Sequence, residues 1–289
     1  MVCRNLKFPL FGCNPSRRGP NIPSETRRSE KNHKSIGMGS VLCADFHAVM
    51  VRQQVGGNVM KQIKAAMCVF GPVLALAGPA VADATPSLTV VELFQSQGCS
   101  DCPPANANVM ALSDRTDLLT LSFGVTYWDN LGWKDTFASP QYTARQWDYA
   151  HALGHSEVYT PQVVVNGRAD IVGRDRKALE ALITRETNRS GPQLQLAQGA
   201  AKIGVGRPGK HDVWLVRFNP RIENVPIARG ENGGITLPHR NVVKQLIKIG
   251  SWNGTPATYN LPAAAQPGLR EAVLVQSGPG GAIVAAAHD

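Results

Sequence analysis

One stretch of this sequence decides the fold, and it reads VVELFQSQGCSDCPP over residues 90–104. An apolar run typical of a β-strand, 88–94, is followed by two cysteines three residues apart and then by a segment with helical character, 103–113. A Cys-x-x-Cys pair between a strand and a helix is the arrangement that dithiol redox sites need. The stretch therefore predicts an α/β fold that carries a redox-type dithiol, Cys99 and Cys102.

An export signal lies ahead of this stretch. From Met60, two lysines precede a mostly apolar run, 65–82, which ends in overlapping Ala-x-Ala patterns at 80–84. A charged start, an apolar middle and a small-residue cleavage site together describe a secretory signal peptide. We therefore expect residues 60–84 to be a cleaved signal peptide, and the mature chain to be periplasmic or secreted without a stable membrane span.

Residues 1–59 are rich in Arg, Lys, Ser, Asn, Gly and Pro, and they show neither helical nor strand periodicity. Such a composition is typical of disorder. Because a signal peptide should begin a chain, we expect translation to start at Met60 and residues 1–59 to be a disordered extension upstream of the true start. A functional basic tail is the alternative, since basic arms commonly bind nucleic acid.

Cleavage after the signal peptide changes the charge and the cysteine content of the chain. The net charge of +9 divides into +6 for residues 1–59, +1 for 60–84 and +2 for 85–289. A nearly neutral mature chain gives no reason to expect nucleic acid as a partner. Four of the six cysteines lie before residue 85, so the mature chain keeps one isolated dithiol.

The pattern after the dithiol helix continues through a second strand and an aromatic-rich stretch. Residues 119–126 alternate between apolar and small or polar side chains, which is the period of a β-strand. The stretch 127–159 contains a helix that Ser139 and Pro140 should begin and Gly154 should end. We expect this helix to form an insertion over residues 127–157.

A hairpin and a last helix complete this part of the chain. Two β-type runs, 162–165 and 169–172, flank Asn166-Gly167, the strongest short-range hairpin signal, and an amphipathic helix follows over about 175–188. The order strand, Cys-x-x-Cys, helix, strand, insertion, proline, hairpin, helix is that of thioredoxin. We therefore predict an α/β, thioredoxin-like domain over 85–190, with a helical aromatic-rich insertion.

Residues 191–289 have a different pattern. Short β-type runs are separated by Gly/Pro turns, without a long helical period: 194–196, 213–218, 242–249, 272–276 and 282–286. This predicts a C-terminal β-rich module, similar to a small β-sandwich. The segment RGENGG, 229–234, is either a binding loop or a turn between strands, and it matches neither a dinucleotide fingerprint nor a P-loop.

Three segments carry a resemblance to a known family. They are the stretch 90–104, the segment YWDNLGWKD over 127–135 and the segment VYTPQ over 158–162. These segments resemble the secreted bacterial thioredoxin-like family called domain of unknown function 1223. The resemblance runs from about residue 88 to the C-terminus and implies the fold and the export. It implies no substrate, because the family is uncharacterised.

The dithiol has a defined chemistry if the predicted helix forms. Cys99 lies just before that helix and Cys102 one turn inside it, and unpaired N–H groups at a helix N-terminus stabilise a thiolate. We predict that Cys99 is the exposed nucleophile and Cys102 the resolving thiol of a thiol-disulfide oxidoreductase. Its partners would be protein or small-molecule thiols and disulfides, and it would need no cofactor. Asp101 places a negative charge beside Cys99, which would make the dithiol more reducing.

Other site residues are implied by the resemblance. In thioredoxin-like folds the proline that matches Pro161 is cis and packs against the dithiol, and the residue before it, Thr160 here, offers backbone groups to an extended substrate. Glu92 lies near the position where thioredoxins keep a buried acid that moves protons for the resolving thiol; a solvated glutamate is the alternative. Trp128 and Trp133 form either a hydrophobic lip that binds substrate or part of the core.

Two other functions fit the same residues. An exported protein can hold two cysteines as a structural disulfide, which leaves a non-enzymatic envelope binding protein, although so short a loop constrains the unfolded chain little. The dithiol can also bind copper or zinc, although two thiolates leave a zinc site incomplete, and we assign no metal ligands. The sequence sets neither the substrate nor the oligomeric state.

Overall fold

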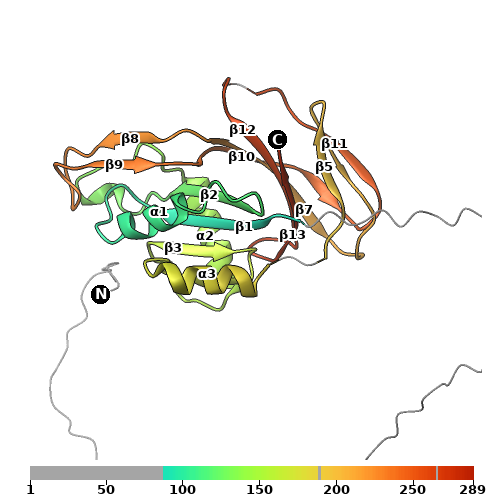
Figure 1. Ribbon diagram of the computed structural model, residues 1–289, viewed down its shortest axis with the longest axis horizontal. Coiled ribbons are helices and arrows are strands. Elements are labelled where there is room, and N and C mark those ends of the chain that lie inside the picture. Colours follow the sequence, from blue (N-terminus) through green and yellow to red (C-terminus); the bar gives the residue numbers. More distant parts are fainter. Residues whose placement is uncertain (1–86, 188–189, 265) are drawn as a thin grey trace, which may run out of the picture. The chain divides into compact units, whose positions relative to one another are not determined.

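An eight-stranded mixed sheet organises the part of the chain that the computed structural model describes, residues 87–187, 190–264 and 266–289. Its strand order is β13-β12-β7-β10-β2-β1-β3-β4, and three α-helices accompany it in the described ranges (Figure 1). The chain is therefore a mixed α/β protein with a large sheet and few helices. The predicted disordered extension and signal peptide lie outside the described residues.

The centre of the sheet comes from the first two strands. β1 (Thr89–Gln95) and β2 (Leu118–Gly124) run parallel, and both are buried along their whole length. β3 (Gln162–Val165) pairs antiparallel with β1, and β4 (Ala169–Ile171) pairs antiparallel with β3. Parallel strands buried on both faces require cover from both sides, and the helices supply it.

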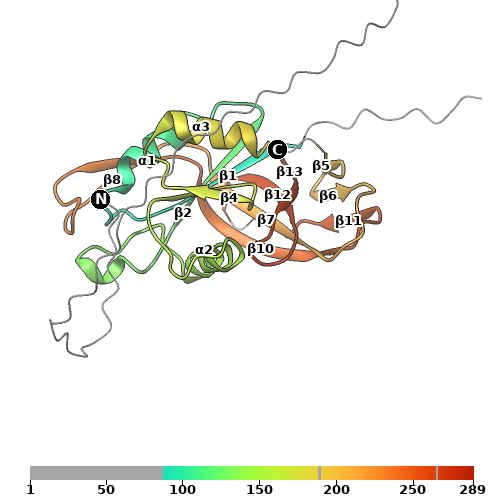
Figure 2. The same ribbon diagram turned by 90° about the horizontal axis from the view of Figure 1, so that it is seen from below.

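The helices lie on opposite faces of these four strands. α1 (Cys102–Met110) and α3 (Arg176–Arg185) share an apolar core with one face, whereas α2 (Pro140–Ala152) packs on the other. Figure 2 shows the two helical layers with the sheet between them. The alternation of side chains along β1 sends Val91 and Leu93 to the first core and Val90 and Phe94 to the second.

The local signals that predicted the helix α2 and the hairpin act as expected. The Ser139 side chain accepts a hydrogen bond from the Gln141 N–H at the start of α2, and Gly154 follows its end with a φ of 79°. Asn166 and Gly167 take φ values of 48° and 62° between β3 and β4. A tight hairpin needs this left-handed conformation, which asparagine and glycine adopt most readily.

Asn166 also joins three elements. Its Oδ1 accepts from the Val90 N–H at 2.7 Å, and its Nδ2 donates to the Glu186 carbonyl at 2.7 Å. Its own N–H donates to the Val90 carbonyl at 2.8 Å, and its carbonyl accepts from the Ile283 N–H at 2.9 Å. One buried residue thereby connects β1, the end of α3 and β13 (Ile283–His288).

The C-terminal strands extend the same sheet from β2. β10 (Val242–Trp252) meets β2 through a parallel bridge between Val242 and Ser122. β7 (His211–Asn219) pairs antiparallel with β10, and β12 (Arg270–Gln276) lies between β7 and β13. The sheet therefore continues without a break across the domain boundary predicted at residue 190.

Two smaller sheets complete the described structure. β5 (Leu194–Ala197), β6 (Ala200–Ile203) and β11 (Ala257–Asn260) form a three-stranded sheet whose apolar residues share a core with β7 and β12. β8 (Glu223–Pro226) and β9 (Thr236–His239) form a separate hairpin. This hairpin lies beside α1 (Figure 1).

We expect Asn166→Ala to lower the free energy of unfolding by about 2–4 kcal/mol, because the Val90 N–H and the Glu186 carbonyl lose buried partners. Urea denaturation measures the change. Gln198→Ala is the matched control, since Gln198 also has a positive φ, 52°, but lies exposed in the turn between β5 and β6. Equal losses in the two variants would contradict the connecting role of Asn166.

Candidate dithiol site

Cys99 and Cys102 lie at the junction of β1 and α1. A turn links them, in which the Cys102 N–H donates to the Cys99 carbonyl at 3.2 Å. α1 begins at Cys102 and continues into Pro103, a residue suited to the first turn of a helix. Cys102 is therefore the first helical residue and not one turn inside the helix, as the sequence suggested. The structure describes both cysteines as free thiols.

Both thiols are buried, with exposures of 0% for Cys99 and 1% for Cys102. The expectation that Cys99 is exposed is wrong. The two thiols also differ in acidity. A hydrogen bond from Cys102 holds the pKa of Cys99 below its usual value against the effect of burial, and Thr160 adds to this effect. Burial raises the pKa of Cys102 well above its usual value. The thiolate therefore forms first on Cys99.

The loop before β3 brings Thr160 and Pro161 to the dithiol. The peptide bond between them is cis, as the resemblance implied. The Cys99 thiol donates to the Thr160 carbonyl across 3.9 Å, and Trp128 Nε1 donates to Thr160 Oγ1 at 2.7 Å. Trp128 is buried in the same core cluster as both cysteines. It thus supports Thr160 from within the core and does not form an exposed lip.

Trp133 contacts the site indirectly, through Gln97. Its Nε1 donates to Gln97 Oε1 at 2.9 Å. Asp135 holds the backbone of the same residue, because its Oδ2 accepts from the Gln97 N–H at 2.7 Å. Burial raises the pKa of this carboxyl group above its usual value. Sequence reasoning missed the roles of Gln97 and Asp135, since no local pattern shows that residue 135 folds back onto residue 97.

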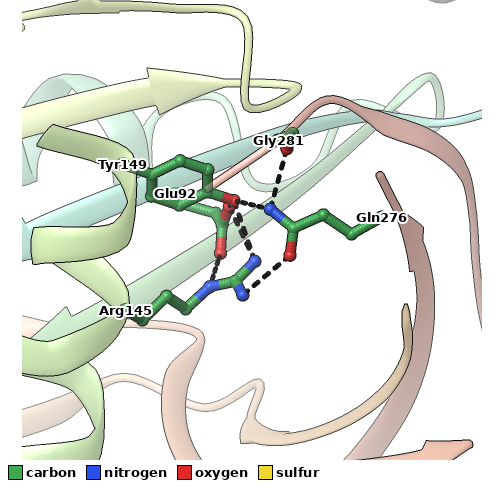
Figure 3. Close-up of polar contacts among 5 residues, drawn as sticks. All are labelled: Glu92, Arg145, Tyr149, Gln276 and Gly281. Carbon is green, nitrogen blue, oxygen red and sulfur yellow. Dashed lines mark hydrogen bonds and ion pairs between the residues drawn. The ribbon is translucent and has the colours of Figure 1, made fainter. Parts of the chain in front are cut away.

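Glu92 lies in a different set of contacts, which Figure 3 shows. The buried carboxylate accepts from Arg145 Nε at 2.8 Å and Nη2 at 3.2 Å, and from the Tyr149 hydroxyl. From β12, Gln276 accepts from Arg145 Nη1 at 3.0 Å and donates to the Tyr149 hydroxyl at 3.1 Å and to the Gly281 carbonyl at 2.8 Å. Every member of this buried group is hydrogen-bonded.

The burial of Glu92 decides between the two sequence interpretations. The residue is fully buried, as expected of a buried acid, and so is not a solvated glutamate. Its carboxylate is engaged by a guanidinium and a phenol, and its part in proton transfer to Cys102 stays a prediction. The signal available in the sequence was the spacing of Arg145 and Tyr149, four residues apart on one face of α2.

The charge beside Cys99 is also balanced. Asp101 Oδ1 pairs with Arg174 Nη1 at 2.8 Å. A cation at this distance offsets the negative charge of the dipeptide between the cysteines. The reducing effect that the sequence assigned to Asp101 is therefore weakened.

Tyr127 is a further neighbour that the sequence did not single out. Its hydroxyl is buried and has no hydrogen-bond partner among the described residues. Burial raises the pKa of Tyr127, and charges on Cys102 and Cys99 raise it further. The phenol is therefore a neutral hydrogen-bond donor within electrostatic reach of both sulfurs.

Two further observations concern metal ligands and membrane-spanning helices. Within the described ranges, no group of three or more His, Cys, Asp or Glu side chains is placed to hold a metal ion. In the same part of the chain, no helix combines the length and the apolar character needed to cross a membrane.

Comparisons with known proteins identify a family and two similar solved structures. A family model described as "Protein of unknown function (DUF1223)" matches residues 90–276. A crystal structure of a protein from Agrobacterium tumefaciens is 34% identical over 71% of this chain and 95% of that chain, with a TM-score of 0.60. HBP35 of Porphyromonas gingivalis is 14% identical over 71% and 75% of the two chains, with a TM-score of 0.49, too low to bear on the fold. No curated protein matches the chain.

We expect Glu92→Gln to lower the free energy of unfolding by about 3–5 kcal/mol, because it leaves the Arg145 guanidinium buried without its counter-charge. Urea denaturation measures this loss. The control is Glu180→Gln, which removes the exposed pair between Arg176 and Glu180 and should change stability by about 1 kcal/mol or less. A loss in Glu92→Gln no larger than in the control would show that the buried pair does not hold the fold.

We expect Thr160→Val to raise the pKa of Cys99, because the hydroxyl that helps to lower this pKa is removed. In the reduced protein, the rate of Cys99 alkylation would then rise at a higher pH than in the wild type, since only the thiolate reacts. Thr184→Val, at an exposed position on α3, is the control. An unchanged pH profile in Thr160→Val would show that this hydroxyl does not act on the thiol.

Proposed function

The chain belongs to the DUF1223 family, a family of proteins of unknown function, and we propose from the geometry of its dithiol site that it is a thiol-disulfide oxidoreductase. Its Cys99–Cys102 dithiol exchanges with the thiols and disulfides of envelope proteins or small molecules. One observation carries the proposal: two free thiols lie at a strand-to-helix junction, with Cys99 just before α1, Cys102 at its first residue, and the Thr160 carbonyl of the cis Thr160-Pro161 loop as the acceptor for the Cys99 thiol. The pKa shifts, lowered for Cys99 and raised for Cys102, agree with a nucleophile at the first position and a resolving thiol at the second.

A thioredoxin-like fold is part of this proposal. It is supported by the order β2-β1-β3-β4, by α1 and α3 on one face and α2 on the other, and by the loop with Thr160 beside Cys99. In this assignment α2 is itself the connection between β2 and β3. The insertion predicted over 127–157 then reduces to the loop before α2, with its short 3-10 helix η1 (Asp129–Leu131).

The reaction follows from the acidity of the two thiols. The Cys99 thiolate attacks one sulfur of a substrate disulfide, so that a Cys99–substrate bond forms while the substrate S–S bond breaks, and the released sulfur takes a proton. Cys102 then loses its proton and attacks Cys99, which releases the other substrate sulfur as a thiol. Two electrons pass to the substrate and the dithiol becomes a disulfide. Electron transfer in the opposite direction uses the same steps in reverse.

The raised pKa of Cys102 suits this order of events. Burial is its main cause, and a hydrogen bond with Cys99 and the Cys99 charge add to it. Formation of the mixed disulfide removes that charge. Cys102 then loses its proton more easily, at the step where its thiolate is needed.

We propose export on the basis of the signal-like segment 60–84. Disulfides persist in the periplasm and outside the cell, so the proposed partners are available there. A non-enzymatic binding protein with a structural bridge is the second candidate. It is favoured by the burial of both sulfurs.

The reduction potential of the dithiol separates the two candidates. For mature protein that begins near Thr85, equilibrated with glutathione or dithiothreitol, we expect a value between about −120 and −270 mV, the range of dithiol oxidoreductases. Cys102→Ser should trap a mixed disulfide on Cys99, whereas Cys99→Ser should trap little. A potential well below about −300 mV, together with no trapped adduct, would assign the bridge a structural role.

A further inference from the structure

A loop from the C-terminal part of the chain lies against the dithiol turn. It connects β8 to β9 and reads RGENGG over residues 229–234. We call residues 229–234 the strap. Three of its six residues are glycine, and two of these, Gly230 and Gly234, have positive φ values of 79° and 87°. The strap is the segment that the sequence left undecided between a binding loop and a turn.

The strap holds the dithiol turn through two side chains. Asn232 Nδ2 donates to the carbonyls of Gln97 and Cys99, both at 2.9 Å, and the side chain is only 5% exposed. Glu231 Oε2 accepts from the Ser100 N–H at 3.0 Å and from Ser100 Oγ at 2.7 Å. Three of these four bonds go to backbone groups of residues 97–100.

The other side of the strap touches the loop that carries Trp133. A Cβ on Gly230 would lie 3.2 Å from the Cβ of Trp133 and 3.6 Å from the Leu131 carbonyl oxygen. Trp133 in turn donates to the side chain of Gln97. The strap, the Trp133 loop and the dithiol turn thus form a continuous ring of contacts.

The base of the same hairpin is anchored separately. Asn106 Nδ2 in α1 donates to the Pro238 carbonyl at 2.6 Å, and Gln95 Nε2 lies 3.2 Å from His239 Nδ1. Leu237 is buried. At the tip, by contrast, only the Glu231 and Asn232 side chains hydrogen-bond to the dithiol turn among the contacts described. The tip and the base of the hairpin are therefore held by separate contacts.

Disulfide exchange needs a free approach to the attacking sulfur, but Cys99 is fully buried. We propose that the strap is a gate over the dithiol, and that a substrate sulfur reaches Cys99 only after Glu231 and Asn232 release the turn. The proposal rests on the proposed function for its use in exchange. The closed contacts and the burial of Cys99 are properties of the fold, and access to the thiol is measurable without any redox partner.

The test is the alkylation rate of Cys99 by iodoacetamide in reduced mature protein, in a Cys102→Ser background, followed by mass spectrometry. Asn232→Ala should raise the rate about tenfold, because the closed state loses two hydrogen bonds of ordinary strength. Asn224→Ala is the matched control, since Asn224 is exposed on β8 of the same hairpin, and its rate should equal that of the parent. Glu231→Ala, at an exposed side chain, supplies the same comparison if Asn232→Ala unfolds.

Two results would overturn the gate. Equal slow rates in the parent, the strap variants and the control would assign the cover to Trp128 and Thr160. A parent rate as fast as that of the urea-unfolded chain would show that Cys99 has no cover. Neither result depends on the reduction potential. A reduction potential far below the range of dithiol oxidoreductases, combined with faster alkylation of Asn232→Ala, would reject the oxidoreductase and keep the gate. A potential within that range, combined with an unchanged alkylation rate in Asn232→Ala, would keep the oxidoreductase and reject the gate.

Discussion

A buried carboxylate and a buried guanidinium constrain how three parts of this fold meet. Each charge is acceptable away from water only if its partner and its remaining hydrogen bonds are in place. Glu92 supplies the carboxylate from β1, and Arg145 and Tyr149 donate to it from α2. Gln276, on β12, hydrogen-bonds to both of these side chains. The central strand, the helix on one face and a C-terminal strand must therefore meet in one geometry. The dithiol turn follows β1 directly, so its position depends on the same set.

The candidate site is assembled from segments far apart in the chain. The turn after β1 supplies Cys99 and α1 supplies Cys102, whereas the loop after β2 supplies Trp128 and the loop before β3 supplies Thr160. The C-terminal hairpin adds the strap. The difference in acidity between Cys99 and Cys102 arises from this assembly, because it depends on burial and on contacts between the two sulfurs and Thr160. A dithiol at the end of an isolated helix would lack most of these contributions.

The sequence predicted the features that local chemistry determines. The start of α2 at Ser139, the turn at Asn166, the four longer C-terminal strands (β7, β10, β12 and β13) and the short strand β5 each have a signal within a few residues. Contacts between distant segments have no signal that names both partners. The spacing of Arg145 and Tyr149 places both on one face of α2 but does not point to Glu92, and the burial of Cys99 was not foreseen. Short strands were missed as well. β8 and β9 include Pro226 and Pro238, residues that weaken any prediction of a strand although they are tolerated in a two-stranded ribbon.

In the proposed oxidoreductase, the strap separates control of access from control of redox chemistry. It binds mainly to backbone groups, the carbonyls of Gln97 and Cys99 and the N–H of Ser100, and any residue other than proline at position 100 retains all three. The side chain of Asp101 is engaged elsewhere, by Arg174. The dipeptide between the cysteines can therefore change and adjust the acidity of the dithiol while the strap still closes over it. In this proposal, access depends on Glu231 and Asn232, more than 120 residues away in the chain, and the C-terminal part of the chain serves the site as well as the sheet.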